Sequence, residues 1–182
     1  NFIIPEMIKE IVYRKGSYYS DVGDFSGAGS ASIYTHSETT PNRIQLGAGG
    51  FGFARALVTG NTDGLGGNLI FGFEHQAYEG PWDSVDEDVG KTNIQLKQSW
   101  ERESGKFMLS LMAYENNWNS ADQIPHRAVR SGLIGKFGSI DPTSGGESSR
   151  YSLSFALDSD LGAGNLSASM YVIDYDLTLF QN

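Results

Sequence analysis

The stretch GKFMLSLMAY, residues 105–114, places apolar side chains at every second position: Phe107, Leu109, Leu111 and Ala113. Successive side chains of a β-strand point to opposite faces, so this period of two predicts a strand with one apolar face. The same alternation recurs in residues 68–78, 91–101, 150–160 and 164–175. Helical periodicity is weak, and one or two helical turns are expected only after Pro5, within residues 4–11. The sequence therefore predicts an all-β, antiparallel fold.

The connections between these strands fall into two classes that alternate along the chain. Residues 59–67, 101–106 and 158–165 are short turns rich in Gly and Asp, whereas residues 79–91 and 118–149 are long connections. Outer-membrane barrels place their short turns on the periplasmic side and their long loops outside. The pattern therefore favours a transmembrane β-barrel over a soluble sandwich. Aromatic residues near the strand ends are typical of a bilayer interface: Tyr78, Trp82, Trp100, Tyr114, Trp118 and Tyr151.

Composition excludes several classes of function. The chain of 182 residues has 13 basic and 22 acidic residues, and its net charge of −9 argues against nucleic-acid binding. It has no cysteine, so a disulfide framework and thiolate chemistry are excluded. His36, His75 and His126 are far apart in the sequence and predict no metal or catalytic cluster. We expect no cofactor and no enzymatic activity. Because the chain starts at Asn1 and ends in a strand-like run, we interpret it as part of a longer protein.

Two motifs imitate other sites. Gly47, Gly49 and Gly52 match a dinucleotide-binding fingerprint, with Glu74 about twenty residues on. A helix after them would span only residues 53–59, so we favour two strands, 43–50 and 51–60, joined by a tight turn. The acids Asp83, Asp86, Glu87 and Asp88 are suitable calcium ligands, but their spacing is not that of an EF-hand, and solvated loop acids are the simpler interpretation.

The segment VYRKGSYYSDVGDFSGAGSASI, residues 12–33, is rich in glycine and tyrosine and lies between two short extended stretches. Together with residues 8–11 it resembles the end of the plug domain of TonB-dependent outer-membrane receptors. Lys15 and Gly16 match that family's basic–Gly pair, Gly23 its Tyr–Gly glycine, and Gly29 its second glycine. Ser17 and Val22 depart from the usual Pro and Tyr. The resemblance covers residues 8–33 at the level of the motif, and the later alternation of strands and loops agrees with it.

The resemblance implies a plug motif made of Lys15, Gly16, Gly23, Gly27 and Gly29. These glycines are expected to permit positive φ and close approach of backbone, and Lys15 is implied to pair with acidic barrel residues. Residues 1–35 would be the C-terminal part of a plug, and residues 36–182 the first seven or so strands of a barrel with about 22 strands. The implied function is energy-coupled uptake of a scarce, bulky nutrient, such as a siderophore, vitamin or oligosaccharide, across the bacterial outer membrane.

The implied partners are outer-membrane lipid, the ligand and the TonB–ExbB–ExbD complex, which would act through a more N-terminal segment. On the strand from Lys106 to Trp118, we expect the apolar face to contact lipid, and Ser110 and Met112 to point into the lumen. The alternative is a soluble β-sandwich that binds carbohydrate. Candidate ligand-binding residues lie in the loops and the plug apex: Tyr18, Tyr19, Trp82, Asp83, Trp118, Asn119, Asp122, His126 and Arg127.

Overall fold

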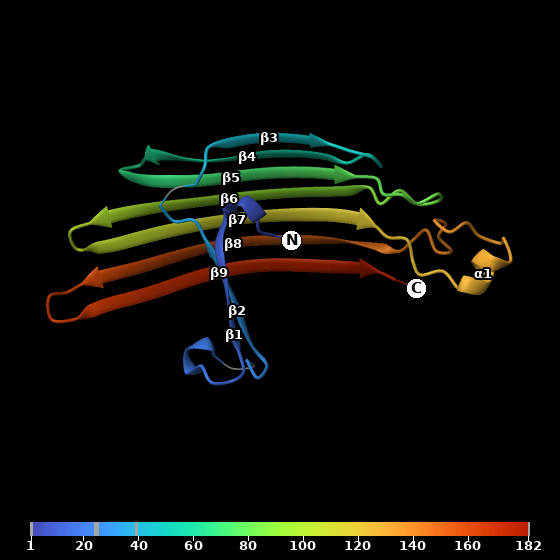
Figure 1. Cartoon of the computed structure of the whole chain (residues 1–182). Coiled ribbons are helices and arrows are strands. Elements are labelled where there is room, and N and C mark those ends of the chain that lie inside the picture. Colours follow the sequence, from blue (N-terminus) through green and yellow to red (C-terminus); the bar gives the residue numbers. More distant parts are fainter. Residues whose placement is uncertain (1, 24–25, 39, 182) are drawn as a thin grey trace.

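In a computed structural model, which describes residues 2–23, 26–38 and 40–181, the chain is all-β and antiparallel (Figure 1). A hairpin of β1 (Ile8–Lys15) and β2 (Gly29–Thr35) forms a sheet of its own. The second sheet has seven strands in sequence order: β3 (Arg43–Ala48), β4 (Ala54–Gly64), β5 (Gly67–Tyr78), β6 (Val89–Arg102), β7 (Gly105–Asn119), β8 (Gly145–Asp160) and β9 (Asn165–Phe180). Within the described residues, β3 and β9 are the edges of this sheet.

Three short helices complete the described structure: η1 (Pro5–Met7), η2 (Ser20–Val22) and α1 (His126–Arg130). Pro5 begins η1, as expected, but the helix has a single turn and the chain is extended from Ile8 onward. Residues 54–59 lie in β4 rather than in a helix, which rules out the dinucleotide-binding arrangement. No helix in the described part of the chain has the length and apolar character required to cross a bilayer.

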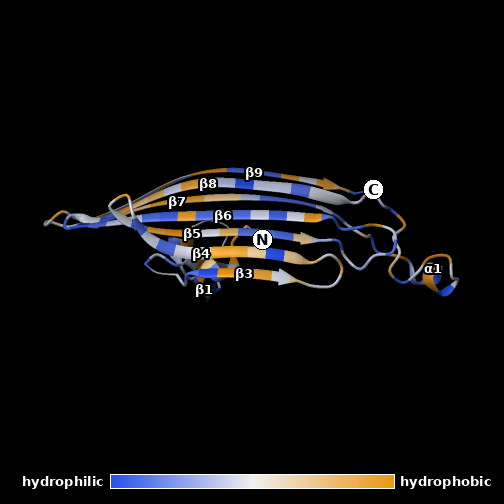
Figure 2. Ribbon diagram, turned by 90° about the horizontal axis from the view of Figure 1, so that it is seen from above, coloured by the Kyte–Doolittle hydropathy of each residue, from blue (hydrophilic) through white to orange (hydrophobic). Residues whose placement is uncertain are grey.

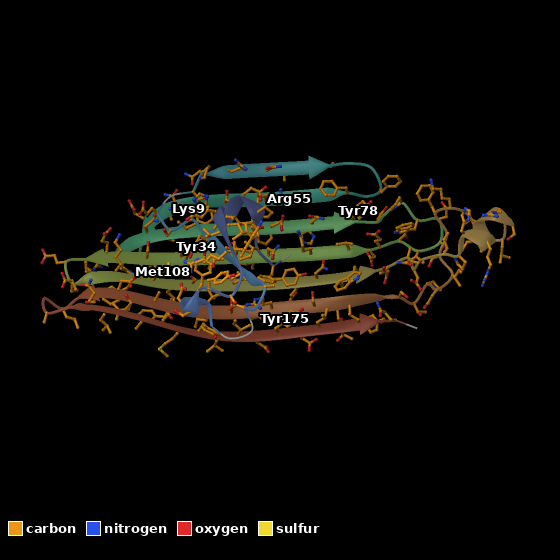
Figure 3. All side chains as sticks on the ribbon, turned by 60° about the horizontal axis from the view of Figure 1, so that its bottom comes forward. Lys9, Tyr34, Arg55, Tyr78, Met108 and Tyr175 are labelled. Atoms are coloured by element: carbon orange, nitrogen blue, oxygen red, sulfur yellow. The ribbon has the colours of Figure 1, made fainter. Side chains whose placement is uncertain are left out.

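The hairpin crosses one face of the seven-stranded sheet (Figures 1 and 3). We call this the docked face, and it carries Lys97, Ser110, Ser154 and the residues in register with them on the other strands. The opposite face, which we call the bare face, carries Leu96, Leu111, Leu153 and the residues in register with those. Successive side chains of each strand point to opposite faces, and residues paired across strands lie on the same face.

The bare face is apolar over most of its length, and none of the described residues packs over it as a second layer. Large side chains on it are exposed to between 38% and 79% of their surface: Ile44, Leu46, Phe73, Leu96, Leu109, Leu111, Leu153, Met170 and Val172. Figure 2 shows the alternation as apolar and polar bands along the strands. A soluble sheet buries its apolar face, so this sheet has the reverse polarity.

A polar row of residues limits this apolar region at one end. His75, Thr92, Glu115, Ser149 and Asp176 occupy successive strands at one level of the bare face. Trp100, Phe107 and Leu157 form a row at the opposite end, next to the short turns. The apolar region is therefore a band with a polar margin toward the long loops and an aromatic and apolar row beside the short turns.

The aromatic residues are not distributed as the sequence predicts. Trp100 and Tyr151 lie on the bare face, at the two ends of the apolar band. Tyr78, Tyr114 and Trp118 lie on the docked face, so their assignment to a girdle on the outside is wrong. Side chains alternate between the two faces along each strand, and these three residues occupy positions in register with the docked face.

The connections segregate as expected. Figure 1 shows the turns β4–β5, β6–β7 and β8–β9 at one end of the sheet, and the two long loops, one of which carries α1, at the other. The long loops are residues 79–88 and 120–144, and only the tight turn between β3 and β4 joins them at that end. The short turns are tighter than expected, because β4 continues to Gly64 and β5 begins at Gly67.

Candidate functional site

The segment Phe2–Met7 packs directly onto the docked face. Ile4 and Met7 are buried with Leu57 of β4 and Ile70 of β5, and these four side chains form a small core. Gly72 of β5 leaves room for this contact, because a Cβ atom there would lie 3.0 Å from Ile4 Cδ1 and 3.1 Å from Met7 Sδ. The absence of a side chain at Gly72 therefore positions the segment against the sheet.

An ionic network joins the same segment to three strands. Arg55 of β4 donates from Nη1 to Glu6 Oε1 at 2.8 Å and from Nη2 to Glu6 Oε2 at 2.8 Å. Its Nε donates to Glu74 Oε1 of β5 at 2.7 Å. The other Glu74 oxygen accepts from Asn93 at 2.8 Å and lies 3.1 Å from Lys91 Nζ, both on β6. The Glu74 side chain is only 1% exposed, so it depends on all of these partners for charge and hydrogen bonding.

The Arg55 hydrogen bond lowers the pKa of Glu6, and this effect exceeds the opposing effect of burial. Glu6 is therefore held in the charged form that a two-pronged guanidinium contact requires. The contact links the N-terminal segment to the sheet by a charge pair as well as by apolar packing.

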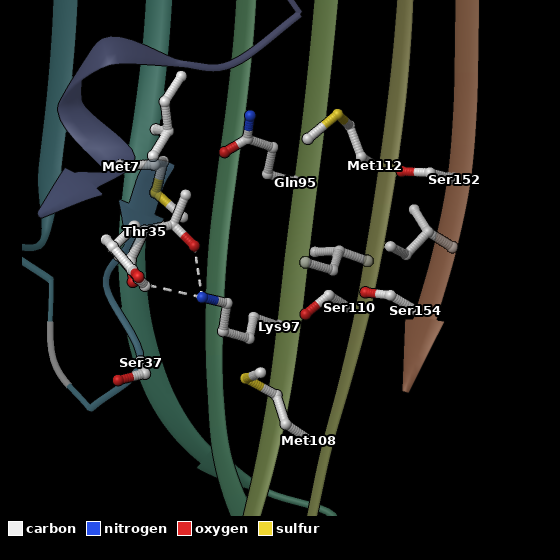
Figure 4. Close-up of a pocket in the computed structure, with 14 residues that line it drawn as sticks. Met7, Thr35, Ser37, Gln95, Lys97, Met108, Ser110, Met112, Ser152 and Ser154 are labelled. Atoms are coloured by element: carbon white, nitrogen blue, oxygen red, sulfur yellow. Dashed lines mark hydrogen bonds between the residues drawn. The ribbon is translucent and has the colours of Figure 1, made fainter. Parts of the chain in front are cut away.

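A lysine links the end of the hairpin to the sheet. Lys97 Nζ of β6 donates to the Thr35 hydroxyl and to the His36 carbonyl oxygen, the latter at 2.9 Å (Figure 4). A cavity of about 470 Å³ lies beside this contact, between hairpin and sheet. Met7 and Tyr34 line it from one side, and small or flexible side chains line it from the sheet: Gln95, Met108, Ser110, Met112, Ser152 and Ser154. Ser110 and Met112, which were expected to point into a lumen, lie on the face opposite Leu111, and the lumen itself stays a prediction.

A second cavity on the docked face lies toward the long loops. It has a volume of about 370 Å³ and is lined by Gln76, Glu87, Val89, Lys91, Tyr114, Asn116 and Trp118. Tyr114 contacts the ring of Phe2 edge-on, with centroids 6.5 Å apart, and receives a hydrogen bond from Ser148 at 3.2 Å. Asn116 Oδ1 is buried with no hydrogen-bond partner among the described residues. The cavity therefore offers aromatic walls and an unused acceptor.

The two long loops are joined by hydrogen bonds and ring packing. Asp83 N donates to the Phe137 carbonyl at 2.9 Å, and Ser139 N donates to Ser84 Oγ at 2.9 Å. The rings of Trp82 and Phe137 lie 6.3 Å apart, and Trp82 Nε1 donates to Glu87 Oε1 at 2.6 Å. These contacts make the two long loops one structural unit, which we call the loop unit, beside the cavity of about 370 Å³.

Several predicted ligand-binding residues belong to this unit. Trp82 and Asp83 lie in the first long loop, and Trp118 lines the cavity beneath it. Asn119 ends β7 and donates from Nδ2 to the Asp86 carbonyl at 3.0 Å, so its amide holds the loop in place. The structure therefore brings these four residues to the same end of the sheet.

The other predicted residues lie elsewhere. Asp122 is exposed and accepts from the next backbone N–H, of Gln123, at 2.6 Å. His126 and Arg127 are exposed at the start of α1, where His126 contacts Arg130 at 3.0 Å. Tyr18 and Tyr19 lie at the tip of the hairpin, which Figure 1 shows away from the loop unit. Tyr18 is 88% exposed, and Tyr19 packs under the Arg14 guanidinium at 5.1 Å.

Three of the four plug-motif glycines have the positive φ that the sequence predicts. Gly16, Gly23 and Gly29 have φ values of 85°, 82° and 135°, as the sequence predicts. A Cβ atom at Gly29 would lie 2.4 Å from the Arg14 carbonyl, so the turn into β2 requires glycine. The expectation for Gly27 is wrong, because its φ is not positive and none of the described residues crowds it.

Lys15 makes no ion pair with the described residues, and Arg14 instead pairs with Asp21 at 2.7 Å within the hairpin. The loop acids at 83–88 also fail to assemble a cluster. Among the described residues, no three His, Asp or Glu side chains are close enough together to hold a metal ion.

Sequence reasoning missed the charged residues of the docked face and of the segment packed on it: Glu6, Arg55, Glu74, Lys91, Lys97 and Arg150. A signal was present, because these charged residues of the strands fall on the polar phase, where the neighbouring positions are mostly small and uncharged. The partner of each charge could not be identified, since Arg55 and Glu6 are 49 residues apart.

Comparison of the chain with protein-family models, with curated proteins and with solved structures finds no match.

Proposed function

We propose that the chain is part of a TonB-dependent outer-membrane transporter. In this proposal the seven-stranded sheet is the first part of the barrel wall, and its bare face contacts lipid. The N-terminal segment and hairpin are the end of the plug, and the docked face lines the lumen. The protein takes up a scarce, bulky nutrient from outside, with energy supplied by the TonB–ExbB–ExbD complex.

The reversed polarity of the sheet is the observation that carries this proposal. The apolar face is bare, while the face rich in Ser, Asn, Gln and charged residues is the one that the hairpin covers. In a soluble β-sandwich the apolar face meets the second sheet and the polar face meets water. Lipid on one side and a wet, plugged lumen on the other account for both faces.

The width of the apolar band also supports the proposal. The bare face of β7 has no charged side chain from Gly105 to Ala113, and Glu115 follows. These nine residues agree with the roughly 9–11 residues that a tilted transmembrane strand needs. Trp100 and Tyr151 occur at the margins of the band, where amphipathic rings are favoured.

The arrangement of the docked face suggests how uptake would work. The joined long loops and the cavity beneath them would receive the solute at the outer surface. The contacts of Arg55 with Glu6, and of Lys97 with Thr35 and His36, would hold the plug end against the wall. A pull on the plug would have to break these contacts before a path along the wall could open.

Cysteine labelling in intact cells tests the membrane orientation. The chain has no cysteine, so Asp122→Cys in a long loop and Ser104→Cys in a short turn each provide a single reactive thiol. A membrane-impermeant maleimide is expected to label Asp122→Cys in intact cells and Ser104→Cys only after the outer membrane is opened. Both residues are exposed, so burial does not explain a difference.

Three results would count against the transporter. Labelling of the turn but not of the loop in intact cells would reverse the orientation. Equal labelling of both, with the protein in the soluble fraction, would exclude a membrane protein. A soluble, monodisperse monomer of residues 1–182 in buffer without detergent would favour the carbohydrate-binding sandwich, because the bare face would then have to be covered by protein.

A further inference from the structure

The charges of the sheet are segregated between its faces. The part of the docked face away from the short turns carries five cationic side chains: Arg43, Arg55, Lys91, Lys97 and Arg150. Glu74 is the one carboxylate on this part of the docked face among the described strands. The acids of β7–β9 at the same end lie on the bare face instead: Glu115, Glu147, Asp174 and Asp176. The docked face is therefore locally positive in a chain whose net charge is −9.

Arg150 of β8 is a partly buried cation of this group without a counter-charge among the described residues, whereas Arg43 is exposed and Lys97 donates to neutral oxygens. Glu74 already binds Arg55 and Lys91. Arg150 forms no ion pair and no hydrogen bond with the described residues, and its Nε atom is buried without a partner. Its guanidinium lies 4.5 Å from the centroid of the Phe2 ring, which orients the plane but leaves the donors free. A partly buried guanidinium with unpaired donors is stabilised by a ligand that brings a negative charge and hydrogen-bond acceptors.

The position of Arg150 adjoins the cavity beneath the long loops. It is the register partner of Tyr114, which lines that cavity together with Asn116 and Trp118. Glu87 on the cavity wall accepts a hydrogen bond from Trp82. A solute in the cavity would therefore meet aromatic rings and amides, with the free guanidinium at one side.

We propose that this part of the docked face binds a small organic anion through an oxyanion group held by Arg150. The planar fork of an arginine binds carboxylate and phosphate oxygens in pairs, so either group satisfies the site. The rest of the solute occupies the cavity between Tyr114, Asn116 and Trp118. The inference rests on the proposed uptake function and names the charge class of the solute. The surrounding cations would raise the local concentration of anions at the site.

Equilibrium dialysis of the full chain in detergent tests this site. Radiolabelled citrate, pyrophosphate and sucrose serve as a carboxylate probe, a phosphate probe and a neutral probe. We expect saturable binding of one or both anions, weakened by added salt because the contact is ionic, and no binding of sucrose. The anion that binds more tightly identifies the preferred oxyanion.

Variants locate the binding. Arg150→Gln is expected to weaken the anion at least about tenfold, since it removes the charge-assisted contacts. Arg150→Lys keeps the charge without the fork, so an intermediate affinity is expected. The matched control is Arg102→Gln, which removes an exposed arginine near a short turn; among the described residues, this arginine donates only to the carbonyls of Glu101 and Gly66. This control is expected to bind as the unaltered chain does.

Equal affinity in Arg150→Gln, Arg150→Lys and the unaltered chain would overturn the site, as would equal binding of sucrose. Loss of binding in Arg102→Gln to the same degree would also overturn it, because binding would then follow net charge alone. Failure of every anion to bind, in a protein whose loop and turn label as the transporter requires, would remove the anion site and leave the transporter intact.

Discussion

At the scale of single residues, the docked face depends on charges that satisfy one another. Arg55 is central, because it binds both Glu6 of the N-terminal segment and the buried Glu74. Removal of one partner from a buried ion pair is costly, since the remaining charge is left in a low-dielectric site. The network thus makes the position of the segment depend on one side chain.

Arg55→Met is expected to lower the free energy of unfolding by about 3–5 kcal/mol, because Glu74 loses a guanidinium partner while it stays buried. Chemical unfolding of the detergent-solubilised chain measures this. The control is Arg43→Met on β3, an exposed arginine on the same face that makes no ion pair with the described residues. A change within about 0.5 kcal/mol is expected there. Equal losses in the two variants would show that the network contributes nothing specific.

Acid is expected to release the N-terminal segment. The pKa of Glu6 is lowered in the folded protein by its hydrogen bond from Arg55. Its stabilising effect is therefore complete above the ordinary glutamate value, about 4.3, and is lost as the pH falls through the lower folded value. Protease sensitivity of the bonds near Ile4 should rise in this range.

Glu6→Gln is the comparison for this pH effect. The variant lacks the titrating group, so the difference in protection between it and the unaltered chain should be large above pH 5 and should shrink as the pH falls. A difference that stays constant with pH would exclude Glu6 as the titrating group, since Glu74 and other acids are present in both proteins.

At the scale of elements, the period of two in the strands was enough to predict the sheet and its faces. Leu109 and Leu111 on β7 were expected on the apolar side, and they pair there with Phe155 and Leu153 of β8. In β9 the period becomes ambiguous after Val172, because Tyr171, Ile173 and Tyr175 are apolar residues on the docked face. Local pattern identifies a strand's two faces but not which face another segment covers.

The docking of the N-terminal segment could not be predicted, because it depends on a long-range fit at Gly72. Gly72→Val is expected to displace Ile4 and Met7 and to destabilise the protein by about 1–3 kcal/mol, the usual cost of overpacking. Limited proteolysis of the segment and chemical unfolding would detect this. Gly64→Val is the control, since no heavy atom of the described residues lies within 4 Å of a Cβ atom there. Unchanged protection in Gly72→Val would contradict the tight fit.

At the scale of the whole molecule, the proposed transporter requires the bare face of the sheet to meet hydrocarbon. Length, composition and loop pattern allowed the all-β fold and the separation of long and short connections to be predicted. The cation-rich docked face could not be predicted, because it arises from the register of strands β3 to β8, among which the cations of β3, β4, β6 and β8 are dispersed in the sequence.

Site-directed spin labelling at two adjacent residues tests this claim most directly. Leu111 and Ser110 lie at the same depth on β7, on the bare and docked faces. With the chain free of cysteine, Leu111→Cys and Ser110→Cys each accept one nitroxide in the protein reconstituted into lipid. We predict that the label at 111 collides more with oxygen, which concentrates in hydrocarbon, than with a polar nickel chelate, and that the label at 110 shows the lower ratio. A label at 111 that neither reagent reaches, or a higher oxygen ratio at 110, would contradict a lipid-facing bare face.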